Sequence, residues 1–291
     1  MIYSIEHKTE YEYQDLVSAC HNIVYQKPLN SSFQKLRKHE YLIEPKPQFV
    51  EERFDFFENS YAYFSLEVPH KNLIVVSKSE VELQSPFWQG INLGNTMNWE
   101  EVAIFLQSTA ASNDVRQFCL ESTLVYYISG MRDYVLAIFR PGRPILESML
   151  EFNTRIYHDF KYKSGYTDIS TPMEKLFHDR TGVCQDFAHF SIACLRSIGL
   201  AAKYVSGYIE NIPPPGKKKL KGSDASHAWL SLFVPNLGWV EFDPTNNMMI
   251  SQQHIRVAVG RDFKDVVPLK GIVYSSGGHE LKVAVDVKKI G

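Results

Sequence analysis

One ten-residue stretch organises the whole chain: Thr181-Gly182-Val183-Cys184-Gln185-Asp186-Phe187-Ala188-His189-Phe190. From Val183 onward, apolar side chains recur at the spacing of one helical face as far as Ile198, and Gly199 follows as a helix stop. This pattern predicts a tight turn that places Cys184 in the first turn of a buried helix. The unpaired N–H groups and the dipole at a helix N-terminus favour an anion, so the position suits a reactive thiolate.

A base and a carboxylate follow the cysteine further along the chain. They lie in the segments Ser226-His227-Ala228-Trp229 and Gly238-Trp239-Val240-Glu241-Phe242-Asp243-Pro244-Thr245. Nucleophile, base and orienting carboxylate are the three parts of an activated thiol site, so Cys184, His227 and Asp243 are the predicted catalytic residues. Each also has a structural interpretation: a buried inert cysteine, a core histidine, and a turn-forming aspartate at a strand end.

The relative orientation of His227 and Asp243 depends on the hairpin between them. The two expected strands are joined by a turn at 235–238. A four-residue loop would place His227 opposite residue 246 and direct the two side chains to opposite faces of the sheet. We therefore expect a three- or five-residue loop, or a bulge, with Gly238 as the most favourable position for it.

Composition and length indicate a soluble globular protein with one large or two ordinary domains. The chain has 291 residues, of which 44% are hydrophobic and 22% charged, and its net charge is −2. This balance gives no electrostatic reason to expect nucleic acid or a membrane surface as a partner. The N-terminus lacks signal-peptide features, no apolar stretch of about 18 residues occurs, and the four cysteines are too sparse for a disulfide scaffold, so we expect a cytoplasmic protein.

The residue patterns divide the chain into two predicted domains of an α+β protein. Residues 1–85 contain short alternating strands separated by turn residues, which predicts an all-β, sandwich-like domain. A connector that bears Gly, Asn and Pro occupies 86–98. In 99–291, helical patterns precede strand patterns, so we expect helices packed on a sheet. The alternating strand at 279–289 can join either domain.

Two further features concern the surroundings of the thiol. The basic segment Lys217-Lys218-Lys219-Leu220-Lys221 precedes His227, and it is either a solvated loop or a lid that favours an acidic substrate. A zinc site of Cys184, His189, Cys194 and His227 is disfavoured, because helical spacing cannot bring the first three together. The sequence contains no metal, nucleotide or flavin motif, and we therefore expect no cofactor.

The predicted chemistry is acyl transfer through a thioester. Cys184 attacks a carbonyl carbon, and His227 takes the thiol proton and later delivers it to the leaving group. The backbone N–H of Cys184 is the expected oxyanion donor. The candidates for a second oxyanion donor or for substrate binding are Tyr162, Gln185, Asp186 and Trp229. For Asp186, the structural alternative is an acidic side chain stabilised by the helix N-terminus.

Three segments of the chain have the sequences GVCQDFAH (182–189), DASHAW (224–229) and GWVEFDPTN (238–246). In combination they resemble the bacterial transglutaminase-like proteins, which are relatives of the papain-like cysteine enzymes. The opening of the chain, with His7 and Tyr11, resembles the β-rich N-terminal domain often attached to that core. The resemblance implies a Cys-His-Asp triad on the three residues predicted above. It also implies a cysteine-bearing helix packed on an antiparallel sheet.

The resemblance leaves the acyl acceptor open. Hydrolysis of a peptide, protein or small amide substrate is preferred because water reaches any open thioester, whereas transfer to an amine requires a site that excludes water. The alternatives are transglutaminase-type transfer and an inert binding or scaffold module. One departure from the family pattern occurs at 55–59, where Glu58 stands in place of the glycine of Asp-x-x-Gly-Asn. This departure affects the local turn and not the triad.

Overall fold

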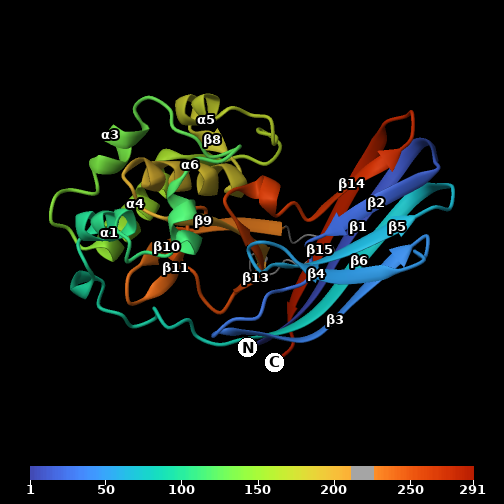
Figure 1. The fold of residues 1–291 in the computed structure, drawn as a ribbon, viewed down its shortest axis with the longest axis horizontal. Helices are drawn as coiled ribbons and strands as arrows, with labels where there is room; N and C mark the ends of the chain where they lie inside the picture. The colour runs from blue at the N-terminus through green and yellow to red at the C-terminus, as the bar shows by residue number, and fades with distance from the viewer. Residues whose placement is uncertain (211–225) are drawn as a thin grey trace, which may run out of the picture.

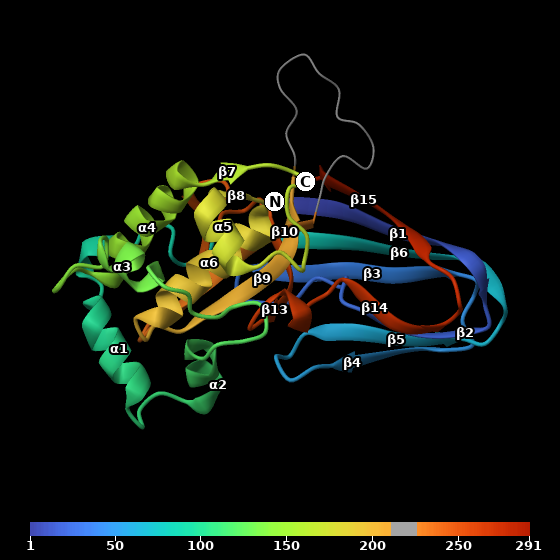
Figure 2. The same ribbon diagram turned by 90° about the horizontal axis from the view of Figure 1, so that it is seen from above.

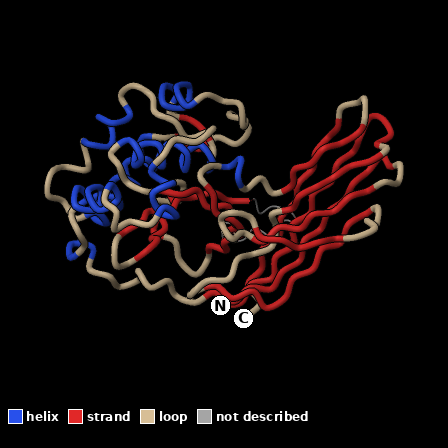
Figure 3. The backbone as a smooth tube through the Cα atoms, viewed as in Figure 1, coloured by secondary structure: helices blue, strands red, loops and turns tan. Residues whose placement is uncertain are grey.

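The computed structural model describes residues 1–210 and 226–291. The lysine-rich segment 217–221 and the beginning of the DASHAW segment, residues 224 and 225, lie outside the described residues. The chain consists of a strand-rich part and a core of helices packed against a sheet (Figure 1). The α-helices of the two described ranges all belong to the core (Figure 3). None of them is long and apolar enough to cross a membrane.

Two four-stranded antiparallel sheets form the strand-rich part, with the orders β15-β1-β6-β3 and β14-β2-β5-β4. The strands are β1 (Ile2–Val17), β2 (Ala19–Val24), β3 (Gln34–Glu44), β4 (Val50–Phe54), β5 (Ser60–Leu66), β6 (His70–Leu83), β14 (Leu269–Tyr274) and β15 (His279–Lys289). Buried and half-buried side chains alternate along β2 and along most of β6. The buried faces of the two sheets share an apolar cluster that includes Tyr13, Phe64 and Leu73. The all-β N-terminal part is therefore confirmed.

The last two long strands of the chain return to the strand-rich part (Figure 2). β15 pairs antiparallel with β1, with Tyr3 opposite Lys289, and β14 pairs antiparallel with β2. The strand at 279–289 thus extends the N-terminal sheet rather than the core sheet. The two chain ends lie together as a result, and the N–H of Ile2 donates to the carbonyl of Gly291 at 2.7 Å.

A five-stranded antiparallel sheet with the order β12-β11-β10-β9-β13 forms the centre of the core. Its strands are β9 (Ala202–Ile209), β10 (Ser226–Val234), β11 (Gly238–Asp243), β12 (Met248–Met249) and β13 (His254–Gly260). The helices are α1 (Trp99–Gln107), α2 (Asn113–Arg116), α3 (Met131–Leu136), α4 (Ile145–Asp159), α5 (Met173–Asp179) and α6 (Cys184–Ser197). Helix α6 packs on β9 and β10. This arrangement confirms the predicted α+β core with the cysteine-bearing helix on an antiparallel sheet.

Two short strands and a buried arginine hold α6 in place. The parallel pair of β7 (Lys161–Tyr162) and β8 (Thr181–Gly182) lies just before the N-terminus of the helix. Near the C-terminus of α6, the buried guanidinium of Arg196 donates to the carbonyls of Ala202 and Arg261. Because these carbonyls solvate the buried charge, the helix is fixed at both ends.

Side-chain bonds to the backbone join the strand-rich part to the core sheet. Asn59 donates to the carbonyl of Val259 in β13 and accepts the N–H of the same residue, both at 2.7 Å. Gln34 makes the same pair of bonds with Arg256, both at 2.8 Å. The N-terminal part therefore contacts the strand at one edge of the core sheet.

The turn before Asn59 forms although it lacks the glycine usual in the family. Asp55 Oδ1 accepts the N–H of Phe57 at 2.8 Å and the N–H of Asn59 at 2.9 Å. Glu58 takes the glycine position with φ of +64°, a left-handed conformation that costs a non-glycine residue about 1–2 kcal/mol. The hydrogen bonds of Asp55 and Asn59 maintain the turn against this strain.

Candidate active site

Cys184 is the first residue of α6 and follows closely after β8. Asp186 fixes the entry to the helix, because its Oδ2 accepts the backbone N–H of Val183 at 2.8 Å and the Thr167 hydroxyl at 2.5 Å. A Cβ at Gly182 would lie only 2.6 Å from this oxygen. Burial raises the pKa of Asp186, and the two hydrogen bonds oppose the increase. These contacts are the ones that the structural alternative for Asp186 predicts, and a role in oxyanion or substrate binding stays a prediction.

The hairpin of β10 and β11 brings His227 and Asp243 to the same face of the sheet. Val234 pairs with Gly238, so the loop contains only residues 235–237, and Gly238 has φ of +86°. Of the predicted alternatives, a three-residue loop, a five-residue loop or a bulge, the structure has the three-residue loop, and the left-handed residue is Gly238. The register differs by one residue from that of a four-residue loop, and His227 Nε2 lies 2.7 Å from Asp243 Oδ2.

His227 connects the thiol to the carboxylate. It is 8% exposed, it contacts Asp243, and it lies close enough to Cys184 for the thiol to raise its pKa. Since Nε2 contacts Asp243, Nδ1 is the ring nitrogen that remains for the sulfur. Burial lowers the pKa of His227, but the Asp243 carboxylate and the hydrogen bonds to Asp243 and Cys184 outweigh burial and raise it. The structure brings the three predicted catalytic residues together and favours a protonated imidazole beside the thiol at neutral pH.

Asp243 is fully buried and receives donors on both carboxylate oxygens. Its Oδ1 accepts the backbone N–H groups of Thr245 and Asn246 at 2.9 and 3.1 Å. Its Oδ2 accepts the Asn246 amide at 2.6 Å and lies 3.1 Å from Nε2 of His254. Burial alone would raise the pKa of Asp243, but His227 and the hydrogen bonds from both histidines keep it well below its usual range. The ionised carboxylate is therefore the stable form.

His254 is a residue of this site that no sequence pattern identified. It begins β13, is fully buried, and packs edge-on against Trp229 with ring centroids 5.2 Å apart. Gly207 of β9 leaves room for the indole, since a Cβ there would lie 2.5 Å from the Trp229 ring. Only the order of the strands in the core sheet places His254 beside Asp243. In the sequence, the signal for this residue is no more than a histidine that precedes an alternating apolar segment.

Trp229 packs against the rings of His227 and His254. Its ring centroid lies 5.9 Å from that of His227, and its Nε1 donates to Glu241 Oε2 at 2.7 Å. Glu241 is fully buried and pairs with Arg256 at 2.8 Å. The indole N–H is therefore already used by Glu241, and a role of Trp229 in oxyanion or substrate binding stays a prediction.

Tyr162 and Gln185 have different positions relative to the nucleophile. Tyr162 lies in β7 opposite Gly182 of β8 and is 53% exposed. Partial burial and the negative charge of Cys184 raise the pKa of the Tyr162 phenol, so the phenol lies within electrostatic reach of the thiolate. Gln185 instead lines a cavity of about 420 Å³ together with His189.

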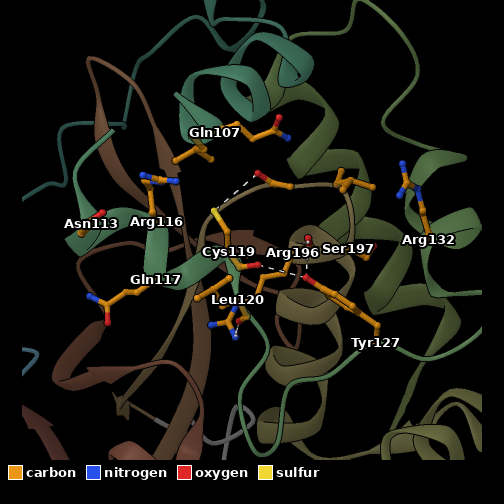
Figure 4. A pocket seen from close by; sticks show the side chains of 13 residues that line it. Gln107, Asn113, Arg116, Gln117, Cys119, Leu120, Tyr127, Arg132, Arg196 and Ser197 are labelled. Carbon is orange, nitrogen blue, oxygen red and sulfur yellow. Dashed lines mark hydrogen bonds between the residues drawn. The ribbon is translucent and has the colours of Figure 1, made fainter. Parts of the chain in front are cut away.

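A larger cavity lies at the opposite end of α6 (Figure 4). It measures about 720 Å³, and its lining includes Gln107, Arg116, Cys119 and Arg196. The Tyr127 hydroxyl at its edge donates to the carbonyls of Cys119 and Arg196 at 3.3 and 3.2 Å. Because α6 has 14 residues, its two ends are about 20 Å apart. This cavity is therefore separate from the triad.

Side chains of the types that can bind a metal meet at the triad itself. The ligand atoms of His227, Asp243 and His254 lie within 4.8 Å of one another, and hydrogen bonds link both histidines to Asp243. The polar atoms of this cluster therefore already have partners. His189, from the zinc set that the sequence disfavoured, accepts the backbone N–H of Phe263 at 3.1 Å.

Comparison with known families matches both parts of the chain. Residues 3–82 match the bacterial transglutaminase-like N-terminal region, and residues 132–244, which include the triad, match the transglutaminase-like superfamily. An uncharacterized protein of Mycobacterium tuberculosis is 37% identical over 98% of this chain and 92% of its own length. The chain therefore belongs to the transglutaminase-like superfamily and carries the bacterial N-terminal region, which confirms the resemblance seen in the sequence.

The chain is also similar to two proteins whose names state an activity. The "Putative Cysteine Protease" from Cytophaga hutchinsonii aligns with a TM-score of 0.75 and 18% identity, covering 100% of this chain and 92% of that one. This similarity shows a shared fold. A protein-glutamine gamma-glutamyltransferase of Pseudomonas aeruginosa is 35% identical over 71 residues, which are 24% of this chain and 11% of that enzyme.

Proposed function

We propose that this chain is a thiol-dependent enzyme that transfers an acyl group from a peptide or amide carbonyl through a thioester. The observation that carries the proposal is the position of His227. It lies close enough to the Cys184 thiol for the two groups to interact, and its Nε2 contacts the buried carboxylate of Asp243 at 2.7 Å. Nucleophile, base and orienting group in this order are the parts of an activated thiol site.

In the proposed reaction, the Cys184 thiolate attacks the substrate carbonyl carbon. The protonated His227 then gives its proton to the leaving amine, while Asp243 stabilises the imidazolium. The backbone N–H of Cys184, at the start of α6, stabilises the oxyanion, and the Tyr162 hydroxyl acts as the second donor. Water, deprotonated by His227, hydrolyses the thioester, and the acid product leaves with the thiol restored.

Hydrolysis is the preferred outcome, because water reaches an open thioester without any further site. Transfer to an amine is the second candidate, supported by the short similarity to the Pseudomonas aeruginosa gamma-glutamyltransferase. The proposed substrate is a peptide, a protein or a small amide in either case. All four cysteines are free thiols, which supports a reducing compartment such as the cytoplasm.

The activated thiol is tested by alkylation with iodoacetamide, followed residue by residue by mass spectrometry between pH 5 and 9. We expect Cys184 to react rapidly at neutral pH and His227→Ala to slow that reaction about tenfold or more. Cys119 in the same digest is the internal control, because burial raises its pKa to about 11. A Cys184 thiol that stays unreactive to pH 8.5 and is unaffected by His227→Ala would contradict the proposal and favour an inert binding module.

A screen of amide substrates separates hydrolysis from transfer. In a hydrolase, the product is the free acid whether or not a primary amine is present. In a transferase, the added amine appears in a new amide.

Tyr162→Phe tests the second oxyanion donor: we expect turnover to fall by about 10²–10³-fold while the alkylation of Cys184 is unchanged. Equal turnover in the two proteins would remove Tyr162 from the site.

A further inference from the structure

The buried His254 is the fourth side chain in a chain of contacts that begins at Cys184. Its relative exposure is 0%, and its Nε2 lies 3.1 Å from Asp243 Oδ2. The Nε2 atom of His227 lies 2.7 Å from the same oxygen. One carboxylate oxygen therefore contacts two imidazole rings, and only one of these rings contacts the thiol.

The second ring nitrogen of His254 determines its tautomer. Nδ1 accepts the backbone N–H of Ser251, with 3.4 Å between the two nitrogens. A neutral imidazole has one donor and one acceptor nitrogen, so the proton resides on Nε2 and His254 donates it to Asp243. The N–H of His254 donates in turn to the Ser251 carbonyl at 3.2 Å, so the turn before β13 also fixes the backbone of this residue.

Packing fixes the ring of His254 as well. It meets Trp229 edge-on, with an interplanar angle of 78°, and Trp229 is itself held by Glu241. Among the described residues, the charged or titratable groups around this packed unit include His227 from β10, Asp243 and Glu241 from β11, and Arg256 from β13. Lys203 of β9 adds a cation that interacts with Glu241 and Arg256. Glu241 and Arg256 pair with each other at 2.8 Å, so Asp243 is the carboxylate that accepts a hydrogen bond from His254.

We infer that His254 is a positioning residue whose Nε2–H holds the Asp243 carboxylate in the orientation that presents Oδ2 to His227. The inference rests on the proposed function, since it adds a fourth member to the proposed Cys184–His227–Asp243 arrangement. Without this donor, Asp243 still has the two backbone N–H groups on Oδ1 and the Asn246 amide on Oδ2. Loss of His254 should therefore weaken the activation of the thiol without abolishing it.

Two matched variants distinguish the effect of the N–H donor of His254 from the effect of its aromatic ring. His254→Phe keeps an aromatic ring against Trp229 and removes the donor, whereas His254→Gln keeps an N–H donor at a similar distance from the backbone and removes the ring. We expect His254→Phe to slow neutral-pH alkylation of Cys184 about tenfold, the factor that a hydrogen bond to a charged group commonly contributes. We also expect the rate profile to move to higher pH, and His254→Gln to restore most of the wild-type rate and profile.

A nitrogen-15 NMR spectrum of the wild-type imidazoles gives a readout that needs no variant. The expected spectrum shows His254 protonated on Nε2 and unprotonated on Nδ1. A His254 ring protonated on Nδ1 would overturn the inference. A Gln variant as slow as the Phe variant would overturn it too, because the ring and not the donor would then matter.

The same experiments distinguish this inference from the proposed function. If His227→Ala slows alkylation and His254→Phe does not, the inference about His254 is wrong and the triad stands. If neither variant changes the rate, the proposed function itself fails. Circular dichroism and thermal unfolding check that each variant is folded. Should His254→Phe not fold, the wild-type tautomer and the rate of His254→Gln decide the inference.

Discussion

Trp229 donates its indole N–H to the buried carboxylate of Glu241 at 2.7 Å, in the same diagonal relationship across the hairpin that joins His227 to Asp243. In both pairs, a β10 side chain contacts a β11 carboxylate that lies two residues before the position directly opposite it. One hairpin register therefore sets both the His227–Asp243 pair and the Trp229–Glu241 pair beside it. A one-residue slip would separate both pairs at once.

Glu241→Ala is expected to lower the free energy of unfolding by about 3–5 kcal/mol. The substitution leaves the guanidinium of Arg256 and the N–H of Trp229 without their buried partner. Glu241→Gln should cost less, because its side-chain oxygen still accepts from Trp229. Urea denaturation measures both variants. Equal stability of wild type and Glu241→Ala would show that the buried pair contributes nothing to the fold.

Gly182→Ala is expected to lower stability by about 1–3 kcal/mol and to slow alkylation of Cys184. The new Cβ would lie 2.6 Å from Asp186 Oδ2 and 2.9 Å from Leu176 Cδ1, so the carboxylate that fixes the start of α6 must move. Thr167→Val is the matched control, since it removes one hydrogen bond of Asp186 at a cost of about 1 kcal/mol. If Gly182→Ala lowers the free energy of unfolding less than Thr167→Val does, the proposed clash with Asp186 is wrong.

Asp243→Asn is expected to reduce turnover of an amide substrate by up to about 10⁴-fold while the protein stays folded. An asparagine can present its amide N–H groups to His227 Nε2, which favours the imidazole tautomer that cannot accept the thiol proton. Steady-state kinetics on a substrate from the screen measures the effect. Thermal unfolding provides the control for folding, and turnover within tenfold of wild type would exclude Asp243 from the triad.

The stability of the protein should depend on pH through His227. The ion pair with Asp243 and the hydrogen bond to Cys184 raise the pKa of His227 to about 10, against about 6.5 in an unfolded chain. A raised pKa means that the stabilisation is complete below about pH 6.5 and is lost as pH rises toward 10. The difference in unfolding free energy between wild type and His227→Asn should therefore shrink steadily from pH 6.5 to 9.5.

Urea denaturation at several pH values measures this difference. Lys203, whose pKa burial lowers to about 8, also titrates in this window, but it is present in both proteins and cancels in the comparison. A difference that stays constant with pH would show that His227 is not held in its charged form.

Glu58→Gly is expected to stabilise the protein by up to about 1 kcal/mol. Glu58 has φ of +64°, and glycine adopts this conformation without the steric cost, although it loses more chain entropy on folding. Urea denaturation measures the change, with Glu51→Gly on the neighbouring exposed strand as the control, where glycine should destabilise. A destabilising effect at both positions would contradict the account of the turn.

The sequence was most informative where chemistry and local patterns coincide. Cys184, His227 and Asp243 lie in segments whose turn residues and alternation could be interpreted directly, and the register argument located the loop irregularity at Gly238 before the fold was known. The partner of the Trp229 indole, the buried Glu241, cannot be recognised from the strand pattern alone. His254 was missed because its strand reaches the site only through the order of the core sheet.

The sequence by itself determined the helix that begins at Cys184, the hairpin that carries its partners and the α+β class of the core. Helical periodicity, glycine conformation and capping act over a few residues, so a single segment contains the information. Only the tertiary structure decided that β15 joins β1 and that His254 meets Asp243. Such contacts join residues far apart in the chain, and the burial of whole sheet faces selects them rather than any local pattern.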